Sequence, residues 1–328
     1  MSIQDSYQRK TVDRNSDKRW SGLANQKVLT TIVWFMFLLP TSGFAAAVDN
    51  VQSGTLSSSG NGTVTANITA VDLSKSFLIF NTRSNSNRPP GSMVRGRIAS
   101  STTVEFERVT NESSTISIQW YVVEFQSGVT VQRGSVNQSS STVNVPINPV
   151  SSLNQAYVTW SKTPSSGDGA WSDDDPIVGE LTTTSNLQFR VNVDNSNHVI
   201  WWQVIEYTNA AEIFVQKGTT SWNSSTKDET ITLGTTIDED NSFLLVGFRT
   251  SGSYAIGKAM LRAEIKNSTQ IKIEREKDGV AISEIVWQVI ELKDGSTVQH
   301  EKSEFSSGDA TETESITSVD LNKSVAFA

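Results

Sequence analysis

The chain contains no cysteine and only two histidines among its 328 residues. Without cysteine, the chain has no disulfide bond, no thiolate zinc site and no cysteine nucleophile. His198 and His300 leave little imidazole for acid–base chemistry, and serine and aspartate are too common in the loops to single out a triad around His198. The sequence therefore predicts a protein that is not an enzyme and that uses no cofactor.

Long hydrophobic runs are scarce, and the main one lies near the N-terminus. Residues 28–39 are mostly apolar, follow six Lys and Arg residues, and precede Ala45, Ala46 and Ala47. This run is shorter than the roughly 20 residues that span a bilayer, and the small residues before Val48 fit a cleavage site. The sequence predicts a signal peptide over residues 1–47 and a secreted or cell-surface protein. The alternative is a retained N-terminal anchor.

Positive charge is in deficit beyond that segment. Residues 48–328 carry 21 Lys and Arg against 32 Asp and Glu, a net charge of −11. Because an acidic surface repels phosphate backbones, nucleic acid is not an expected partner. Export without cysteine is more typical of prokaryotic proteins than of small eukaryotic secreted domains.

One strand-like segment occurs three times in the chain. Its core is Trp-x-Val-(Val/Ile)-Glu, and the copies begin at Trp120, Trp202 and Trp287, which are 82 and 85 residues apart. We call these segments the signature strands. A period of this length indicates tandem domains with one signature strand each. The short alternating apolar segments between Gly, Asn and Ser turns predict an all-β fold of tandem antiparallel β-sandwich repeats, of immunoglobulin-like size and about 85 residues each.

The repeat pattern predicts where the domains begin and end. Each full repeat is expected to end with the Val-Gln strand that follows its signature strand, such as residues 129–134. The predicted divisions are a signal peptide over 1–47, repeats over 48–135, 136–219 and 220–303, and the truncated start of a fourth repeat over 304–328. A lone strand is not stable, so either the sequence is a fragment or its C-terminal strand mediates self-association.

The glutamate of the signature strand is unexpected on a central strand, because a buried, unpaired carboxylate is costly. Arg108, Arg190 and Arg275 each lie 12 residues before their tryptophan, so a recurring Arg–Glu pair with residues such as Glu124 is one interpretation. The apolar register of the second repeat is one residue shorter, which predicts that Arg190 faces the other way. The alternative interpretation is a glutamate at the solvated end of the strand.

An acidic, glycine-rich loop over residues 165–176 has no counterpart in the other repeats. Clustered carboxylates on such a loop are ligands that calcium prefers, although the spacing is not that of a helix–loop–helix calcium site. The predicted calcium ligands are Asp168, Asp173, Asp174 and Asp175. The alternative is a solvated acidic loop that binds no ion.

Two tryptophans outside the signature strands, Trp171 and Trp222, are candidates for stacking on a sugar ring. The alternative for Trp171 is that it packs against its own domain.

Export, repetition and an acidic polar surface favour a structural or adhesive role, as a stalk or a display array at the cell surface. The arrangement resembles, in general architecture, the tandem sandwich modules of prokaryotic cell-surface proteins, a likeness that implies no site. Its expected partners are extracellular polymers or glycans. The alternatives are an array of carbohydrate-binding modules and the non-catalytic part of a larger exported enzyme.

Overall fold

The computed structural model describes residues 45–60, 62–108, 114–165, 168–194, 198–252, 255–304 and 311–327. All but the last three residues of the predicted signal peptide lie outside these ranges. The described residues are predominantly β-strands joined by short loops, so the prediction of an all-β fold is confirmed. In the described part of the chain, no helix is both long enough and apolar enough to cross a membrane.

The described strands fall into three consecutive groups, which we call the first, second and third units. The first unit contains β1 (Ala47–Ser59), β2 (Gly62–Asn67), β3 (Ser76–Ser84), the short helix α1 (Pro89–Ser92), β4 (Arg95–Ser100), β5 (Thr103–Arg108) and β6 (Thr115–Ser127). The second contains β7 (Val129–Asn137), β8 (Thr142–Pro146), β9 (Ala156–Thr163), β10 (Val178–Thr183), β11 (Asn186–Arg190) and β12 (Val199–Tyr207). The third contains β13 (Ile213–Trp222), β14 (Asp228–Thr232), η1 (Glu239–Asn241), β15 (Ser242–Thr250), η2 (Ile256–Lys258), β16 (Arg262–Asn267), β17 (Gln270–Glu274) and β18 (Ile282–Leu292).

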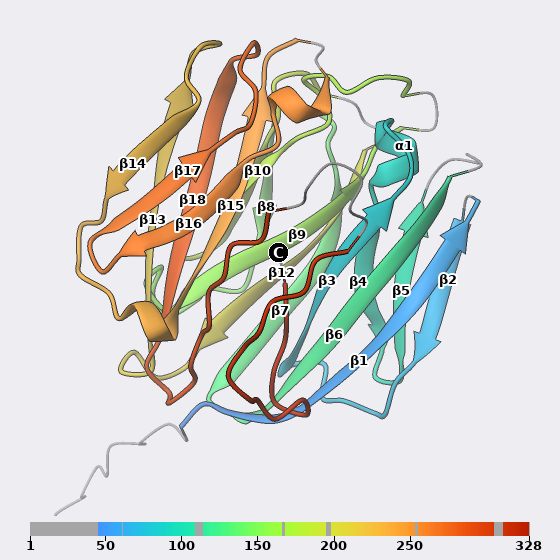
Figure 1. Cartoon of the computed structure of the whole chain (residues 1–328). Helices are drawn as coiled ribbons and strands as arrows, with labels where there is room; N and C mark the ends of the chain where they lie inside the picture. The colour runs from blue at the N-terminus through green and yellow to red at the C-terminus, as the bar shows by residue number, and fades with distance from the viewer. Residues whose placement is uncertain are drawn as a thin grey trace, which may run out of the picture. The chain divides into compact units, whose positions relative to one another are not determined.

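Each unit forms two antiparallel three-stranded sheets with the same strand pattern (Figure 1). The larger sheets have the orders β1-β6-β3, β7-β12-β9 and β13-β18-β15. The smaller sheets have β5, β11 and β17 at their centres. The signature strands β6, β12 and β18 are therefore central strands, as their apolar residues on both faces predict.

The strand that follows each signature strand belongs to the next unit, which corrects the predicted assignment of residues 129–134 to the first repeat. β7 pairs with β12, with Val131 opposite Ile205, and does not pair with β6. The physical reason is that β1 and β3 already occupy both edges of β6. The turn at Gly128, whose φ is +79°, is a link between units and not a hairpin. Strand pairing divides the units after Ser127, ahead of the predicted boundary at 135.

Each unit has a hydrophobic core that draws on both of its sheets, and the signature tryptophan lies in it. Trp120, Trp202 and Trp287 are only 5, 7 and 7 % exposed, as predicted. In the second unit, the indole ring lies so close to Gly134 on β7 that a Cβ there would be 2.5 Å from the ring carbon Cζ2. Glycine is therefore needed at this position to admit the ring.

The other face of the larger sheets contributes to one further core that the three units share. Phe77, Ile205 and Ile290 come from different units and belong to this single buried cluster, which we call the shared core. The described residues from 45 onward accordingly form one compact body. A string of independently folded modules would not share a core in this way, so the larger sheets depend on one another for burial.

Glutamine side chains connect neighbouring units across the edges of the larger sheets. The amide of Gln203 on β12 bonds both the N–H and the C=O of Leu78 on β3, each at 2.9 Å. Gln288 on β18 does the same to Val158 on β9, at 3.0 Å for both bonds. These bonds satisfy backbone groups at strand edges that otherwise lack a strand partner.

The chain after β18, which we call the C-terminal segment, makes the same kind of contact that is found near the start of each unit. Gln299 bonds the backbone of Thr317 through both of its amide atoms, as Gln52 does with Thr69. The segment contacts the first unit, since Val51 N–H donates to Asn322 O at 2.7 Å. It forms no strand within the described residues, and self-association through it stays a prediction.

The signature glutamates accept backbone hydrogen bonds, which corrects the Arg–Glu interpretation. Each carboxylate accepts the N–H of a turn that precedes the third strand of its own unit. The pairs are Asp72 N–H to Glu124 at 2.6 Å, Ser151 N–H to Glu206 at 2.5 Å and Asp238 N–H to Glu291 at 3.2 Å. A carboxylate that accepts such a bond is not left unpaired on burial.

Candidate metal centre in the second unit

The three arginines before the signature strands divide into two groups. Arg108 and Arg275 are 2 and 4 % exposed, and their guanidinium groups donate to backbone carbonyls such as Ser114 O and Val280 O. Arg190 faces the other way, as the shorter register predicted, and forms ion pairs at the contact with the third unit. The residue of the second unit that occupies the buried position, two after Phe189, is the apolar Val191.

Lys162 on β9 supplies the buried cation that the second unit otherwise lacks. It is 4 % exposed, and its Nζ donates to the carbonyl oxygens of Asp174 and Asp175, the latter at 2.7 Å. Burial lowers the pKa of Lys162 to about 7, although the charges of Asp175 and Asp174 oppose the shift. The lysine thus fixes the end of the acidic loop above the larger sheet of its unit.

Next to this lysine, the structure brings together three side chains that could hold a metal ion. Asp168 and Asp174 come from the acidic loop, and His198 immediately precedes β12. One ligand atom from each lies within 4.8 Å of the other two. Nitrogen and oxygen donors at this spacing are typical of divalent-cation sites.

Several polar atoms of this cluster are buried without a hydrogen-bond partner among the described residues. They are Nε2 of His198, Oδ2 of Asp168 and Oδ1 of Asp175. The His198 and Asp175 residues are 0 % exposed. Burying polar atoms without hydrogen-bond partners is energetically costly. The grouping of these three atoms therefore indicates a site where a bound ligand or a proton would satisfy them.

Burial also shifts the protonation of this cluster. It raises the pKa of Asp175 to about 8, and the negative charge of the neighbouring Asp168 adds to the rise. Burial, assisted by the charge of Lys162, lowers the pKa of His198 to about 4. The imidazole is therefore neutral at pH 7, the form in which histidine binds metals.

The four predicted calcium ligands do not converge on one point. Asp173 turns away and accepts the N–H of Gly252 in the third unit at 3.1 Å. Asp175 uses its Oδ2 to accept the N–H of Ser172 at 2.8 Å. Of the four predicted ligands, Asp168 and Asp174 lie near one another, and His198 lies beside them. This set is too poor in oxygen for calcium, which takes six to eight oxygen ligands.

The two predicted sugar-stacking tryptophans have different environments. Trp222 is 4 % exposed, lies in the core of the third unit, and donates its indole N–H to Glu229 at 2.7 Å. Its ring faces are covered, so the prediction for Trp222 is wrong. Trp171 is half-buried, and its indole N–H donates to Asn87 O of the first unit at 2.9 Å. Only Trp171 keeps part of its ring available to a sugar.

The acidic loop connects three units. Besides the contacts of Trp171 and Asp173 with the first and third units, the backbone of Gly169 accepts a bond from Arg88 of the first unit at 3.2 Å. A loop peculiar to the second unit therefore ties all three units together at one end of their strands.

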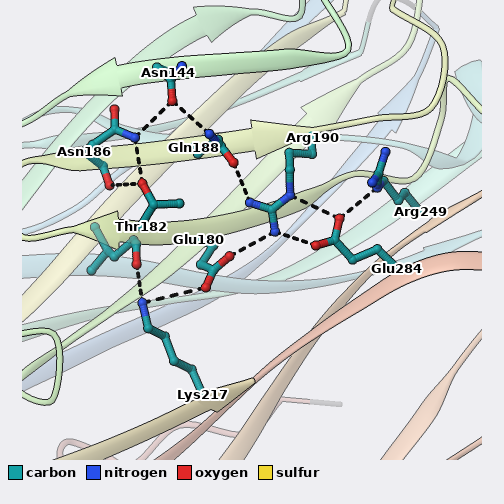
Figure 2. Close-up of polar contacts among 10 residues, drawn as sticks. Asn144, Glu180, Thr182, Asn186, Gln188, Arg190, Lys217, Arg249 and Glu284 are labelled. Atoms are coloured by element: carbon teal, nitrogen blue, oxygen red, sulfur yellow. Dashed lines mark hydrogen bonds and ion pairs between the residues drawn. The ribbon is translucent and has the colours of Figure 1, made fainter. Parts of the chain in front are cut away.

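A second polar cluster lies where the second and third units meet (Figure 2). Arg190 on β11 lies between Glu180 on β10 at 2.9 Å and Glu284 on β18 at 2.7 Å. Arg249 on β15 approaches the other side of Glu284 at 2.8 Å, and Lys217 on β13 approaches Glu180 at 3.8 Å. Every charge has an opposite partner, so this cluster is an interface between units and offers no free group for chemistry.

Sequence reasoning missed the role of Lys162 and the meeting of His198 with the acidic loop. The sequence did contain a signal that the second unit differs. At the position where the first and third units have a buried arginine, the second unit has Val191. His198 lies 24 residues from Asp174, and only the fold brings the two together.

The chain matches no known protein family, and no curated protein is significantly similar to it in sequence.

Proposed function

We propose that the chain is an exported structural protein of tandem β-sandwich repeats that serves display or adhesion at the cell surface. The observation that supports this most is the shared core, together with the glutamine bridges between units. Fixed units make a stiff body that can present loops in a constant geometry, whereas a flexible string could not. We therefore favour display over a stalk of separate beads.

The strand edges support the same proposal. Exposed edges promote aggregation, and here Gln203 and Gln288 cover two of them with side-chain bonds. The acidic surface predicted from the composition adds electrostatic repulsion between copies, which favours solubility outside the cell.

Surface labelling of intact producing cells tests the proposal. We expect an antibody against the purified chain to label unpermeabilised cells, and deletion of the gene to reduce attachment to surfaces. Labelling only after permeabilisation would contradict the location. Unchanged attachment would contradict the adhesive role.

The alternative is carbohydrate binding through Trp171, whose ring is half-buried at the junction of two units. A glycan array probed with the purified chain would give a signal that Trp171→Ala removes and that Trp222→Phe, a change in the core, retains. Absence of binding to every polysaccharide would reject this alternative.

A further inference from the structure

We propose that Asp168, Asp174 and His198 bind one zinc ion, which fixes the acidic loop to the start of β12. This inference is independent of the display proposal. The proposed site shares Asp168 and Asp174 with the predicted calcium ligands and adds His198 in place of Asp173 and Asp175.

The spacing of the three side chains fits a single small cation. Their ligand atoms all lie within 4.8 Å of one another. Zinc binds nitrogen and oxygen at about 2.0–2.2 Å, so two ligands of a tetrahedral zinc ion are about 3.4 Å apart. The side chains therefore need to close by up to about 1.4 Å, which rotation about side-chain bonds provides.

The histidine is held in the orientation that a metal ligand requires. Its Nδ1 lies 3.0 Å from the carbonyl oxygen of Asp174, which can only accept a hydrogen bond. The proton is therefore on Nδ1, and the lone pair of Nε2 is free. Nε2 has no hydrogen-bond partner among the described residues, and the ring is fully buried 3.7 Å from Oδ2 of Asp174. A ligating histidine that donates its other N–H to a backbone carbonyl is the usual arrangement around protein-bound metals.

A second buried atom points to the same place. Oδ2 of Asp168 has no hydrogen-bond donor among the described residues, although it is shielded from solvent. An uncompensated carboxylate oxygen beside a free imidazole lone pair is unfavourable, and a divalent cation relieves both at once.

The ligand set selects zinc over calcium. One imidazole and two carboxylates give the three protein ligands that zinc commonly takes, with a water completing the tetrahedron. Calcium has little affinity for imidazole nitrogen and needs more oxygens than this cluster offers, because Asp173 and one oxygen of Asp175 are engaged elsewhere.

Bound zinc would act as a structural clamp. The loop spanning Asp168 to Asp174 carries the contacts to the first and third units, while His198 immediately precedes β12. Joining the two restrains the loop in the position from which it ties the units together, as metals that close loops do.

Titration calorimetry of the metal-stripped 328-residue chain with zinc chloride tests the site. We expect one zinc per chain, a higher melting temperature with zinc, and at least tenfold weaker binding in His198→Gln and in Asp168→Asn. Asp173→Asn is the matched control in the same loop, and its zinc affinity should equal that of the unchanged chain. Asp168 is only half-buried, so its variant keeps the test valid if His198→Gln fails to fold.

Three outcomes would overturn the proposal. They are no stoichiometric zinc binding by the folded chain, zinc binding that both ligand variants retain, and a site that binds calcium chloride more tightly than zinc chloride.

Discussion

At the scale of single residues, the recurring positions are explained by close packing and by backbone hydrogen bonds. The signature tryptophan requires a glycine on the neighbouring strand, as Gly54 and Gly134 show. The signature glutamate accepts the N–H of a turn residue. Both roles are structural: the tryptophan packs in the core and the glutamate satisfies a backbone N–H.

Gly134→Ala should destabilise the protein by about 1–3 kcal/mol, because the new Cβ would lie 2.5 Å from the ring of Trp202 and force the core to shift. Urea denaturation followed by tryptophan fluorescence measures the change. Gly234→Ala is the control, since the nearest atom to its Cβ would be at 3.8 Å, and it should change stability by less than about 0.5 kcal/mol. Equal effects of the two substitutions would contradict the packing argument.

Glu206→Leu should cost about 1–3 kcal/mol, because it removes the charged acceptor of the Ser151 N–H, and Glu206 itself is only 8 % exposed. Glu206→Gln retains an acceptor oxygen and should cost less than about 1 kcal/mol. Chemical denaturation of both variants gives the comparison. A large loss in the glutamine variant would show instead that the negative charge is required.

At the scale of elements, edges and loops connect the units. Gln203 and Gln288 complete strand edges, and the Arg190 cluster joins the smaller sheet of the second unit to the third unit (Figure 2). Glu284 is central to that cluster. Burial raises its pKa, but the hydrogen bonds and charges of Arg190 and Arg249 outweigh burial, so the pKa lies below its ordinary value of 4.5.

Glu284→Gln should lower stability by about 1–3 kcal/mol at pH 7, because Arg249 loses its anionic partner and Arg190 loses one of its two. Since the folded-state pKa of Glu284 is depressed, its contribution is present above about pH 4.5 and is lost as the pH falls through the lower, folded-state value. The difference between the two proteins should therefore shrink in acid. Denaturation curves from pH 3 to pH 7 measure it, with Glu304→Gln, 79 % exposed in its side chain, as a control of little effect. A constant difference across this range would contradict the assigned shift.

At the scale of the whole molecule, the shared core makes the three units interdependent. Phe77, Ile205 and Ile290 come from three different units and lie together in this buried cluster. A unit on its own would expose this face to water and lose the corresponding hydrophobic stabilisation.

The chain should unfold in one cooperative transition. Tryptophan fluorescence, which reports the separate cores, and far-UV circular dichroism should give coincident urea curves. An isolated second unit, residues 129–207, should aggregate or remain unfolded. Three resolved transitions, or a soluble and cooperatively folded second unit, would show that the units are independent domains.

The sequence by itself determined the all-β fold, the central position of the signature strands and the burial of their tryptophans, because these follow from local periodicity and composition. It also predicted the reversed direction of Arg190, because a one-residue change of register exchanges the faces of a strand. Local pattern did not decide which strand pairs with which. The assignment of residues 129–134 failed for that reason, since a turn after Ser127 looks the same in a hairpin and in a link between units.

Only the tertiary structure decided the partners of side chains distant in sequence. It buried Trp222, turned Asp173 toward the third unit and set His198 against Asp174. It also buried Lys162 in the second unit, whereas the first and third units bury Arg108 and Arg275. These outcomes depend on how sheets pack through contacts between residues far apart in the chain, whereas periodicity reports only which face of a strand is apolar.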